Sequence, residues 1–509
     1  MILILIALGA SLTMPLAYCA LLVFDYLRDA KCLKRFQNLS PLAGITYLPW
    51  IWASIRLQRY VVLHKTHRNT PIVRIGPNAL SFNDPRAAQA IYGHGSVAIK
   101  DAYYDSGAGA HRHLADTRDK AEHSRKRRIL AAGYALTTVV RWEDKVVSRI
   151  QALLNQYDQH CPKAKESFQS DTPSLDHRRW MNLFTIDIIN DIGLSANLRL
   201  LEKGDDLIEV QDANGKMYQC HFRDSLWRGH TIHMVFAWLP RWYDTIKTMT
   251  SWHPRWKAGE NYGNIVATLC KRRLDRYLAG EKLDDFFTSL LEGRGGSMNM
   301  LPLGEIIAEC AVMLNAGSDT TGIALTNCLY LLIKNPKCLA KLRKEVDEAL
   351  TDEDIVAPFD KVKYLPYLKA CLDESLRLHP PSATTTPRVT PPQGQDIMGE
   401  WIAGNTTVLC PTYTLHRNPV AFPNPDTYKP ERWLEDDAKE IQQSFLPFST
   451  GARGCIGRNI TYMEQQMLIA SLVHRYDFAL PTPKWELSYS EAVTCSPGPM
   501  PIRVSRRNL

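Results

Sequence analysis

Apolar residues recur every three or four positions along most of the chain between Asp119 and Leu378, and this spacing predicts α-helices. The longest candidate begins at Pro302, is apolar on nearly every side and ends before Asn335-Pro336. At ~1.5 Å per residue it would extend roughly 50 Å, which is long enough to cross a whole domain. Because a helix without a polar face is normally buried, we expect it to run through the core.

Strand-like stretches are short and few. Residues 72–76 and 79–82 predict a hairpin around Pro77-Asn78, and Asp84-Pro85 marks the start of a following helix. The pattern therefore predicts a mainly α protein with small β-sheets.

The first 24 residues contain no charged side chain, and a helix of that length would cover the ~30 Å hydrocarbon core of a bilayer. Basic residues follow directly, beginning at Arg28, so the positive-inside rule places the remainder of the chain in the cytosol. We expect a transmembrane anchor over residues 1–24 and a basic flank with a Pro/Gly hinge over residues 25–45. The alternative is a cleaved signal peptide, but the segment lacks a basic start and its apolar run is too long.

Composition favours one large domain over residues 46–509. Of the 509 residues 45% are apolar and 22% charged, and no linker, repeat or charge block divides them. The twelve cysteines include no Cys-x-x-Cys pair, which removes the spacing of a zinc ribbon, an iron–sulfur cluster or a thioredoxin-type site. Free thiols in a reducing compartment fit better than a disulfide scaffold.

The net charge of +8 is mild for this length. The run Arg125-Lys126-Arg127-Arg128 is similar to a nuclear localisation patch, but it lies in an amphipathic stretch of a chain with an expected membrane anchor. We expect no nucleic-acid partner, and we interpret the run as a docking face for an acidic protein.

One cysteine lies in a glycine-framed loop, residues 448–457, ahead of an apolar helix predicted over residues 460–472. The glycines allow a tight turn and close approach of a flat ligand, and Arg453 can neutralise a carboxylate on that ligand. The dipole of the helix would favour Cys455 as a thiolate, which suits an axial ligand of haem iron. The alternative is an ordinary buried structural cysteine.

Polar groups interrupt the longest helix at Ala316-Gly317-Ser318-Asp319-Thr320-Thr321. Gly317 would let a ligand lie against the helix, and Thr320 can bond a carbonyl one turn back and loosen the helix locally. Asp319 and Thr320 are candidates for a proton relay. The alternative is that Asp319 is a buried acid held by an Arg or Lys and that Thr320 only packs.

The Cys455 loop resembles the signature of the cytochrome P-450 family, Phe-x-x-Gly-x-Arg-x-Cys-x-Gly, at every fixed position. The resemblance implies the cytochrome P-450 fold, a single haem domain, haem b held by Cys455 and a monooxygenase that splits O2. Asp319 and Thr320 match the family's acid–alcohol pair. This implies that they pass protons to iron-bound oxygen.

Three charged residues match a buried network that braces the haem-binding loop in this family: Glu374 and Arg377, three positions apart on one helix, and Arg432 in Pro430-Glu431-Arg432-Trp433. We expect these three to be structural and not catalytic. Taken without the resemblance, the Glu374–Arg377 pair is equally consistent with an ordinary surface ion pair.

The two propionates of haem need cations when they are buried. The candidates at matching positions are Arg453, Arg388, His123 and Arg127. His123 stands where the family often has Trp, and Arg127 could instead belong to an exposed basic face.

The resemblance also implies partners. No Gly-x-Gly-x-x-Gly follows a strand and no segment remains for a flavin domain, so electrons would come from a separate NADPH-cytochrome reductase. With the anchor, this implies a single-pass enzyme of the endoplasmic reticulum membrane with a cytosolic catalytic domain. A haem-thiolate isomerase or peroxygenase and a non-catalytic haem sensor are the alternatives.

Local motifs such as Tyr92-Gly93-His94-Gly95 and Thr117 to His123 resemble the fungal benzoate para-hydroxylase group and its relatives in secondary metabolism. This implies an aromatic or polyketide-derived apolar substrate, with a terpenoid or alkaloid as the alternative. By position in the family, the substrate pocket lies near residues 96–110, 217–239, 308–320 and 382–386. No residue in these segments stands out as a partner for a substrate carboxylate.

Overall fold

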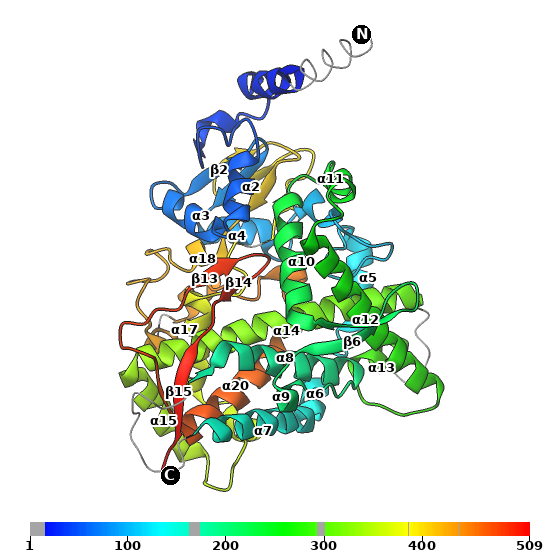
Figure 1. Ribbon diagram of the computed structural model, residues 1–509. Helices are drawn as coiled ribbons and strands as arrows, with labels where there is room; N and C mark the ends of the chain where they lie inside the picture. The colour runs from blue at the N-terminus through cyan, green and yellow to red at the C-terminus, as the bar shows by residue number, and fades with distance from the viewer. Residues whose placement is uncertain (1–15, 162–173, 293–300, 385, 437, 509) are drawn as a thin grey trace.

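The computed structural model describes residues 16–161, 174–292, 301–384, 386–436 and 438–508. Helices make up most of it, and α14 (Leu303–Lys334) crosses the middle of the molecule (Figure 1). Helices α8 (His177–Leu194), α17 (Pro366–Leu378) and α20 (Arg458–Arg475) pack against it. The expected long central helix and the helix after Cys455 are confirmed.

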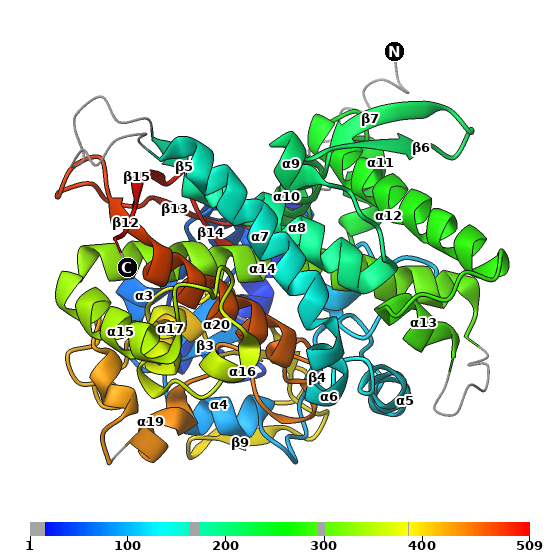
Figure 2. The same ribbon diagram turned by 90° about the horizontal axis from the view of Figure 1, so that it is seen from below.

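Other helices cover this central layer. Helix α10 (Phe222–Phe236) packs along α12 (Pro254–Leu278), and both lie on the far side of α14 from α20 (Figures 1 and 2). The remaining α-helices of the described residues with printed bounds are α2 (Leu48–Ile55), α3 (Arg59–His67), α4 (Pro85–Tyr92), α5 (Lys120–Leu130), α6 (Leu136–Val139), α7 (Glu143–His160), α9 (Leu200–Lys203), α11 (Tyr243–Met249), α13 (Phe286–Leu291), α15 (Pro336–Ala349), α16 (Phe359–Val362), α18 (Thr412–Leu415) and α19 (Ala438–Ser444).

The largest sheet has the order β1-β2-β3-β11-β8-β4. Strands β2 (Ile72–Gly76) and β3 (Ala79–Phe82) form the expected hairpin, and Asp84 caps α4 as its sequence predicted. The other strands of this sheet are β1 (Gln37–Asn38), β4 (Ile99–Lys100), β8 (Arg388–Val389) and β11 (Thr407–Leu409). Pairing of β4 with β8 places Lys100 opposite Arg388, which brings two cations to one edge of the sheet.

The smaller sheets lie around the helices. They are formed by β9 (Gln395–Ile397) with β10 (Glu400–Ile402), β6 (Leu207–Gln211) with β7 (Met217–His221), β13 (Tyr489–Glu491) with β14 (Cys495–Pro497), and β12 (Tyr476–Ala479) with β15 (Pro501–Arg506) and β5 (Leu175–Asp176). The β13–β14 hairpin packs on α14 and therefore reaches the centre of the fold.

Of the expected anchor, residues 1–15 lie outside the described residues. Residues 16–28 are helical and largely exposed (Figure 1). Among the described residues, the search for a helix both long enough and apolar enough to span a bilayer finds none. The segment after it is part of the domain's packing, because β1 pairs with β2 and Leu33 and Phe36 are buried against Leu80.

One buried acid in α20 predicts a pH effect on stability. Glu464 is 3% exposed, and burial raises its pKa from 4.5 to about 8. The folded protein must then hold a proton that the unfolded chain releases above pH 4.5, so this residue lowers stability as the pH rises from about 4.5 to about 8.

We expect Glu464→Gln to raise the free energy of unfolding by about 2–3 kcal/mol at pH 7 and by almost nothing near pH 4.5. Chemical denaturation at the two pH values measures this. A gain of equal size at both would show that the carboxyl does not titrate in this range.

Candidate haem site

The Cys455 loop is held by backbone geometry. The Cys455 N–H donates to the Phe448 carbonyl at 2.8 Å, after a short 3-10 turn at Gly451–Arg453. Gly451 has a φ of 72°, and a Cβ there would lie 2.2 Å from the Tyr92 carbonyl oxygen, so only glycine fits. Gly457 has an ordinary φ of −82°; contrary to expectation, it is not needed for a tight turn.

The sulfur of this loop is accessible inside the protein. Cys455 is classed as exposed by its surface area, although protein atoms surround it closely enough to desolvate the thiol. Burial raises the pKa of Cys455, while the N–H groups of Gly457 and Arg458 and the charge of Arg127 lower it, and the net shift is upward. The expected preference for thiolate is therefore not met by the protein alone, because desolvation outweighs the helix N-terminus. Both observations fit a sulfur that opens on an internal space.

Helix α14 passes beside this loop. The hydroxyls of Thr321 and Thr461 lie 3.3 Å apart and join α14 to the first turn of α20. Within the otherwise buried α14, Ala316 is exposed, and Ala308, Val312 and Thr320, at the same four-residue spacing, are partly exposed. One face of α14 therefore borders a space that protein atoms do not fill.

Thr320 and Gly317 differ in how far they follow expectation. The Thr320 hydroxyl donates to the Ala316 carbonyl at 2.7 Å, as expected, although the α-helix runs through this point without interruption. The expectation that Gly317 leaves room for a ligand is wrong. A Cβ on Gly317 would lie 2.6 Å from the side chain of Ile189, so its role is close packing of α14 on α8, and Ala316 borders the open space instead.

Asp319 points away from Cys455, towards α8 and the β13–β14 hairpin. Arg178 donates to Asp319 Oδ1 at 2.7 Å, and the Thr494 hydroxyl donates to Oδ2 at 2.5 Å. Burial raises the pKa of Asp319, but Arg178 and Thr494 lower it more, so the carboxyl is held ionised. Asp319 is thus a buried acid paired with an arginine, the alternative that the sequence left open, and this pairing does not exclude a role in proton transfer.

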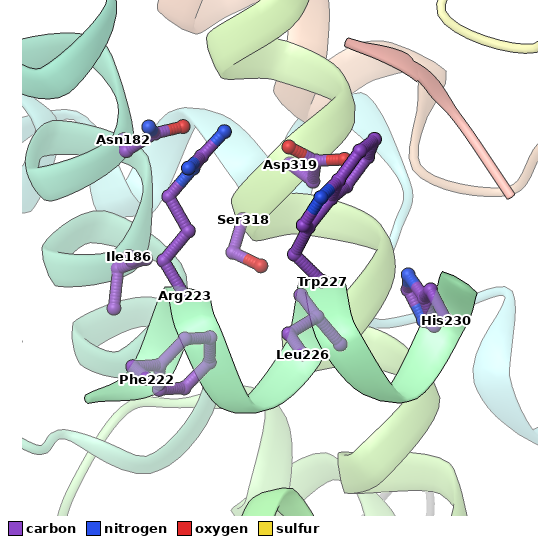
Figure 3. Close-up of a pocket in the computed structure, with 9 residues that line it drawn as sticks. All are labelled: Asn182, Ile186, Phe222, Arg223, Leu226, Trp227, His230, Ser318 and Asp319. Carbon is purple, nitrogen blue, oxygen red and sulfur yellow. The ribbon is translucent and has the colours of Figure 1, made fainter. Parts of the chain in front are cut away.

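A small cavity lies beside Asp319, between α8, α10 and α14 (Figure 3). Its volume of about 10 Å³ is close to what one water molecule occupies. Arg223 and His230 of α10 line it, and buried nitrogens of both, Nε and Nδ1, have no hydrogen-bond partner in the described structure. A water there would connect Asp319 to polar groups of α10.

Cations converge at the other side of the Cys455 loop. Arg453 donates to the carbonyls of Thr117 and Arg118 at 2.6 and 2.9 Å, and Arg388 donates only to carbonyls and a hydroxyl of residues 386–387. Lys100 Nζ bonds the carbonyl of Ala115. No carboxylate among the described residues forms an ion pair with any of these three cations.

These charges repel one another. Burial lowers the pKa of Arg453 to about 10, and Arg388 lowers it further as the nearest cation. Burial and the same two arginines hold the pKa of Lys100 well below its usual value, and burial with Arg453 and Lys100 lowers the pKa of His123 to about 4. A buried cluster of this kind calls for an anion. Lys100 was missed in the sequence because nothing in its local pattern shows that β4 pairs with β8.

Arg127 has a different partner from the one expected. Its guanidinium donates to the Gly454 carbonyl at 2.6 Å, so it holds the backbone next to Cys455. It lies near the Cys455 sulfur, whose pKa its charge lowers. The structure thus favours a brace for the Cys455 loop over an exposed basic face.

The basic run is not a free docking face. Arg125 pairs with Glu122 and Glu305, at 2.7 and 2.6 Å, and Lys126 is buried against Glu305 and Glu309. Within residues 125–128 only Arg128 is fully exposed. The interpretation as a docking surface for an acidic protein is therefore wrong for Arg125 and Lys126, because acids of α5 and α14 already neutralise them.

Glu374, Arg377 and Arg432 form the expected buried network. Glu374 accepts from Arg377 at 2.8 Å and from Arg432 at 3.1 Å, and all three side chains are nearly inaccessible. Arg377 also donates to the carbonyls of His416, Pro425 and Thr427. The surface-pair alternative is thereby excluded, and the network ties α17 to the segment that leads into the Cys455 loop.

These features together fit a flat, dianionic iron ligand. The accessible sulfur supplies a metal donor, the open face of α14 supplies room, and the unpaired cations supply partners for two carboxylates. Haem has this combination of properties, so the residues present fit it.

Comparison with known proteins decides the family. The family model described as Cytochrome P450 matches residues 39–502. The chain belongs to the cytochrome P450 family. It is therefore a haem-thiolate monooxygenase, an oxidoreductase that uses O2 and a redox partner.

Several curated fungal P450 enzymes are similar to this chain over most of its length. Benzoate 4-monooxygenase of Aspergillus niger is 29% identical and covers 91% of each chain. Tryprostatin B 6-hydroxylase of Aspergillus fumigatus is 28% identical over 93% of this chain and 82% of its own. A cytochrome P450 monooxygenase of Stereocaulon alpinum is 29% identical over 87% and 83%.

Proposed function

We propose that this P450 inserts one oxygen atom of O2 into a C–H bond of a small aromatic or alkaloid intermediate of fungal secondary metabolism, with haem b as cofactor and NADPH-cytochrome reductase as electron donor. The observation that carries the proposal is the accessible sulfur of Cys455 beside the open face of α14. The relatives that hydroxylate benzoate and tryprostatin B support the substrate class.

Each residue of the site has a proposed task. Cys455 is the axial ligand, and Arg127 fixes its loop through the Gly454 carbonyl. Arg388, Arg453, Lys100 and His123 hold the propionates, whose charge would relieve the repulsion among these cations. When bound, haem supplies the iron at which O2 is reduced.

Thr320 and Asp319 manage protons on the distal side. The Thr320 hydroxyl gives its hydrogen to Ala316, which leaves its oxygen lone pairs towards the open face of α14. Asp319 is ionised while Arg178 and Thr494 hold it, so it must leave these partners to deliver a proton. A haem-thiolate isomerase, a peroxygenase or a non-catalytic sensor has no comparable need for such a pair.

Isotope labelling tests the proposal. Metabolites should be compared between cells with the intact gene and cells carrying the Cys455→Ser variant, under 18O2. We expect a product that carries one labelled oxygen only with the intact gene. A product of unchanged composition, or one formed by purified enzyme from peroxide alone and not with reductase and NADPH, would instead support the isomerase or peroxygenase.

Thr320→Ala is expected to keep haem but to lower the fraction of reductant that yields product by at least ~10-fold, with peroxide formed instead. Thr326→Ala is the matched control, since Thr326 makes the same bond to a carbonyl one turn back, at 2.7 Å, farther along α14. The assay counts NADPH, peroxide and product. Equal coupling in both variants would remove Thr320 from the relay.

Membrane attachment is part of the same proposal. We propose a single-pass anchor over residues 1–24 in the endoplasmic reticulum membrane, with the catalytic domain in the cytosol. Large apolar side chains are exposed on α2 and around α11, and both lie at the end of the molecule from which residues 16–28 project (Figure 1). They are Leu48, Trp52, Ile55, Trp242, Met249 and Trp252.

Removal of residues 1–28 should shift most of the protein from the carbonate-washed membrane fraction to the peripheral or soluble one. The residual peripheral binding should fall when Trp242 and Trp252 are replaced by Ser. Retention of the truncated chain after the carbonate wash would contradict the anchor.

A further inference from the structure

A polar pair spans the space between α10 and α14. Asn315 Nδ2 lies 3.1 Å from His230 Nε2, and Asn315 is next to Ala316, the exposed residue of the central helix. Figure 3 shows that His230 projects from α10 on the side where Asp319 of α14 lies. Asn315 is one helical turn before Asp319 and therefore faces α10 beside the open face.

Asn315 has unused hydrogen-bonding capacity. A primary amide offers one carbonyl oxygen and two N–H groups, and the contact with His230 uses one of the three. Asn315 is partly exposed, and its remaining amide atoms are neither buried nor bonded in the described structure. The pair with His230 fixes the orientation of the amide, so its free oxygen is presented as an acceptor.

The surroundings of this amide carry no free positive charge. Burial lowers the pKa of His230 and of His233 to about 4, so both rings are neutral near pH 7. Arg178 is paired with Asp319, at 2.7 Å. Arg223 faces the small cavity behind Asp319.

We propose that Asn315 is a specificity-determining residue that accepts a hydrogen bond from a neutral N–H or O–H group of the substrate, such as an amide, an indole or a phenol. Carboxylates are then poor ligands, because they would meet an acceptor oxygen and the ionised Asp319 without an available cation. This inference rests on the proposed function and narrows its substrate class to uncharged aromatic molecules.

Three probes of nearly the same shape test it in the holoenzyme: benzamide, benzoate and methyl benzoate. Binding is followed by the change of the haem Soret band on titration. Benzamide carries a donor and no charge, benzoate carries a charge and no donor, and methyl benzoate carries neither. We expect wild-type enzyme to bind benzamide about 3- to 10-fold more tightly than methyl benzoate, the effect of one neutral hydrogen bond, and benzoate most weakly.

Asn315→Leu should abolish the preference for benzamide over methyl benzoate and leave methyl benzoate binding unchanged. The control is Asn264→Leu, an equally half-buried amide of α12 that bonds Tyr218. A normal ferrous carbon-monoxide spectrum in each variant shows that the haem site is intact, which separates failure of this inference from failure of the proposed function. With that spectrum normal, tighter binding of benzoate, no response to benzamide, or an unchanged preference in Asn315→Leu would overturn the inference.

Discussion

Replacement of Cys455 by Ser is expected to abolish oxygenation and the red-shifted carbon-monoxide absorption that a thiolate-ligated ferrous haem gives. A serine hydroxyl has the size of the thiol but does not supply the same electron density to iron. The carbon-monoxide difference spectrum and product formation measure the effect.

Cys410→Ser is a suitable control, because this cysteine is also fully within the domain but is buried away from any accessible space. It should leave the band in place. A red-shifted band that persists in Cys455→Ser would mean that another sulfur binds the iron.

Replacement of Glu374 by Gln is expected to destabilise the folded protein by about 3–5 kcal/mol, the usual cost of removing one member of a buried ion pair. Arg377 and Arg432 would both lose their anionic partner in a site without solvent. Because Arg377 also holds three carbonyls of residues 416–427, the segment before the Cys455 loop should loosen and haem should be lost.

Denaturation midpoints and haem content measure this effect. Glu400→Gln serves as the control, since its pair with Arg35 is exposed and should contribute about 1 kcal/mol or less. Equal stability and full haem content in Glu374→Gln would show that the network does not brace the loop.

The sequence predicted most of what is local. The apolar circumference of the central helix, the hairpin at residues 72–82 and the glycine-framed cysteine loop each depend on neighbours in the chain, and the structure confirms them. The Glu374–Arg377 pair was equally visible, since three positions on a helix bring side chains together.

What the sequence did not predict depends on distant contacts. Lys100 joins the cation cluster only through the pairing of β4 with β8, and Thr494 reaches Asp319 only because the β13–β14 hairpin packs on α14. Gly317 was assigned to ligand space because its partner Ile189 lies on another helix. The basic run at residues 125–128 was misjudged for the same reason: its acids, Glu305 and Glu309, come from α14.

The central claim is that the sulfur of Cys455 binds haem iron. X-ray absorption at the iron edge of the purified, haem-loaded protein tests it most directly. We predict one sulfur among the nearest neighbours of iron in the wild type and none in Cys455→Ser. A first shell of nitrogen and oxygen alone in the wild-type protein would contradict the account.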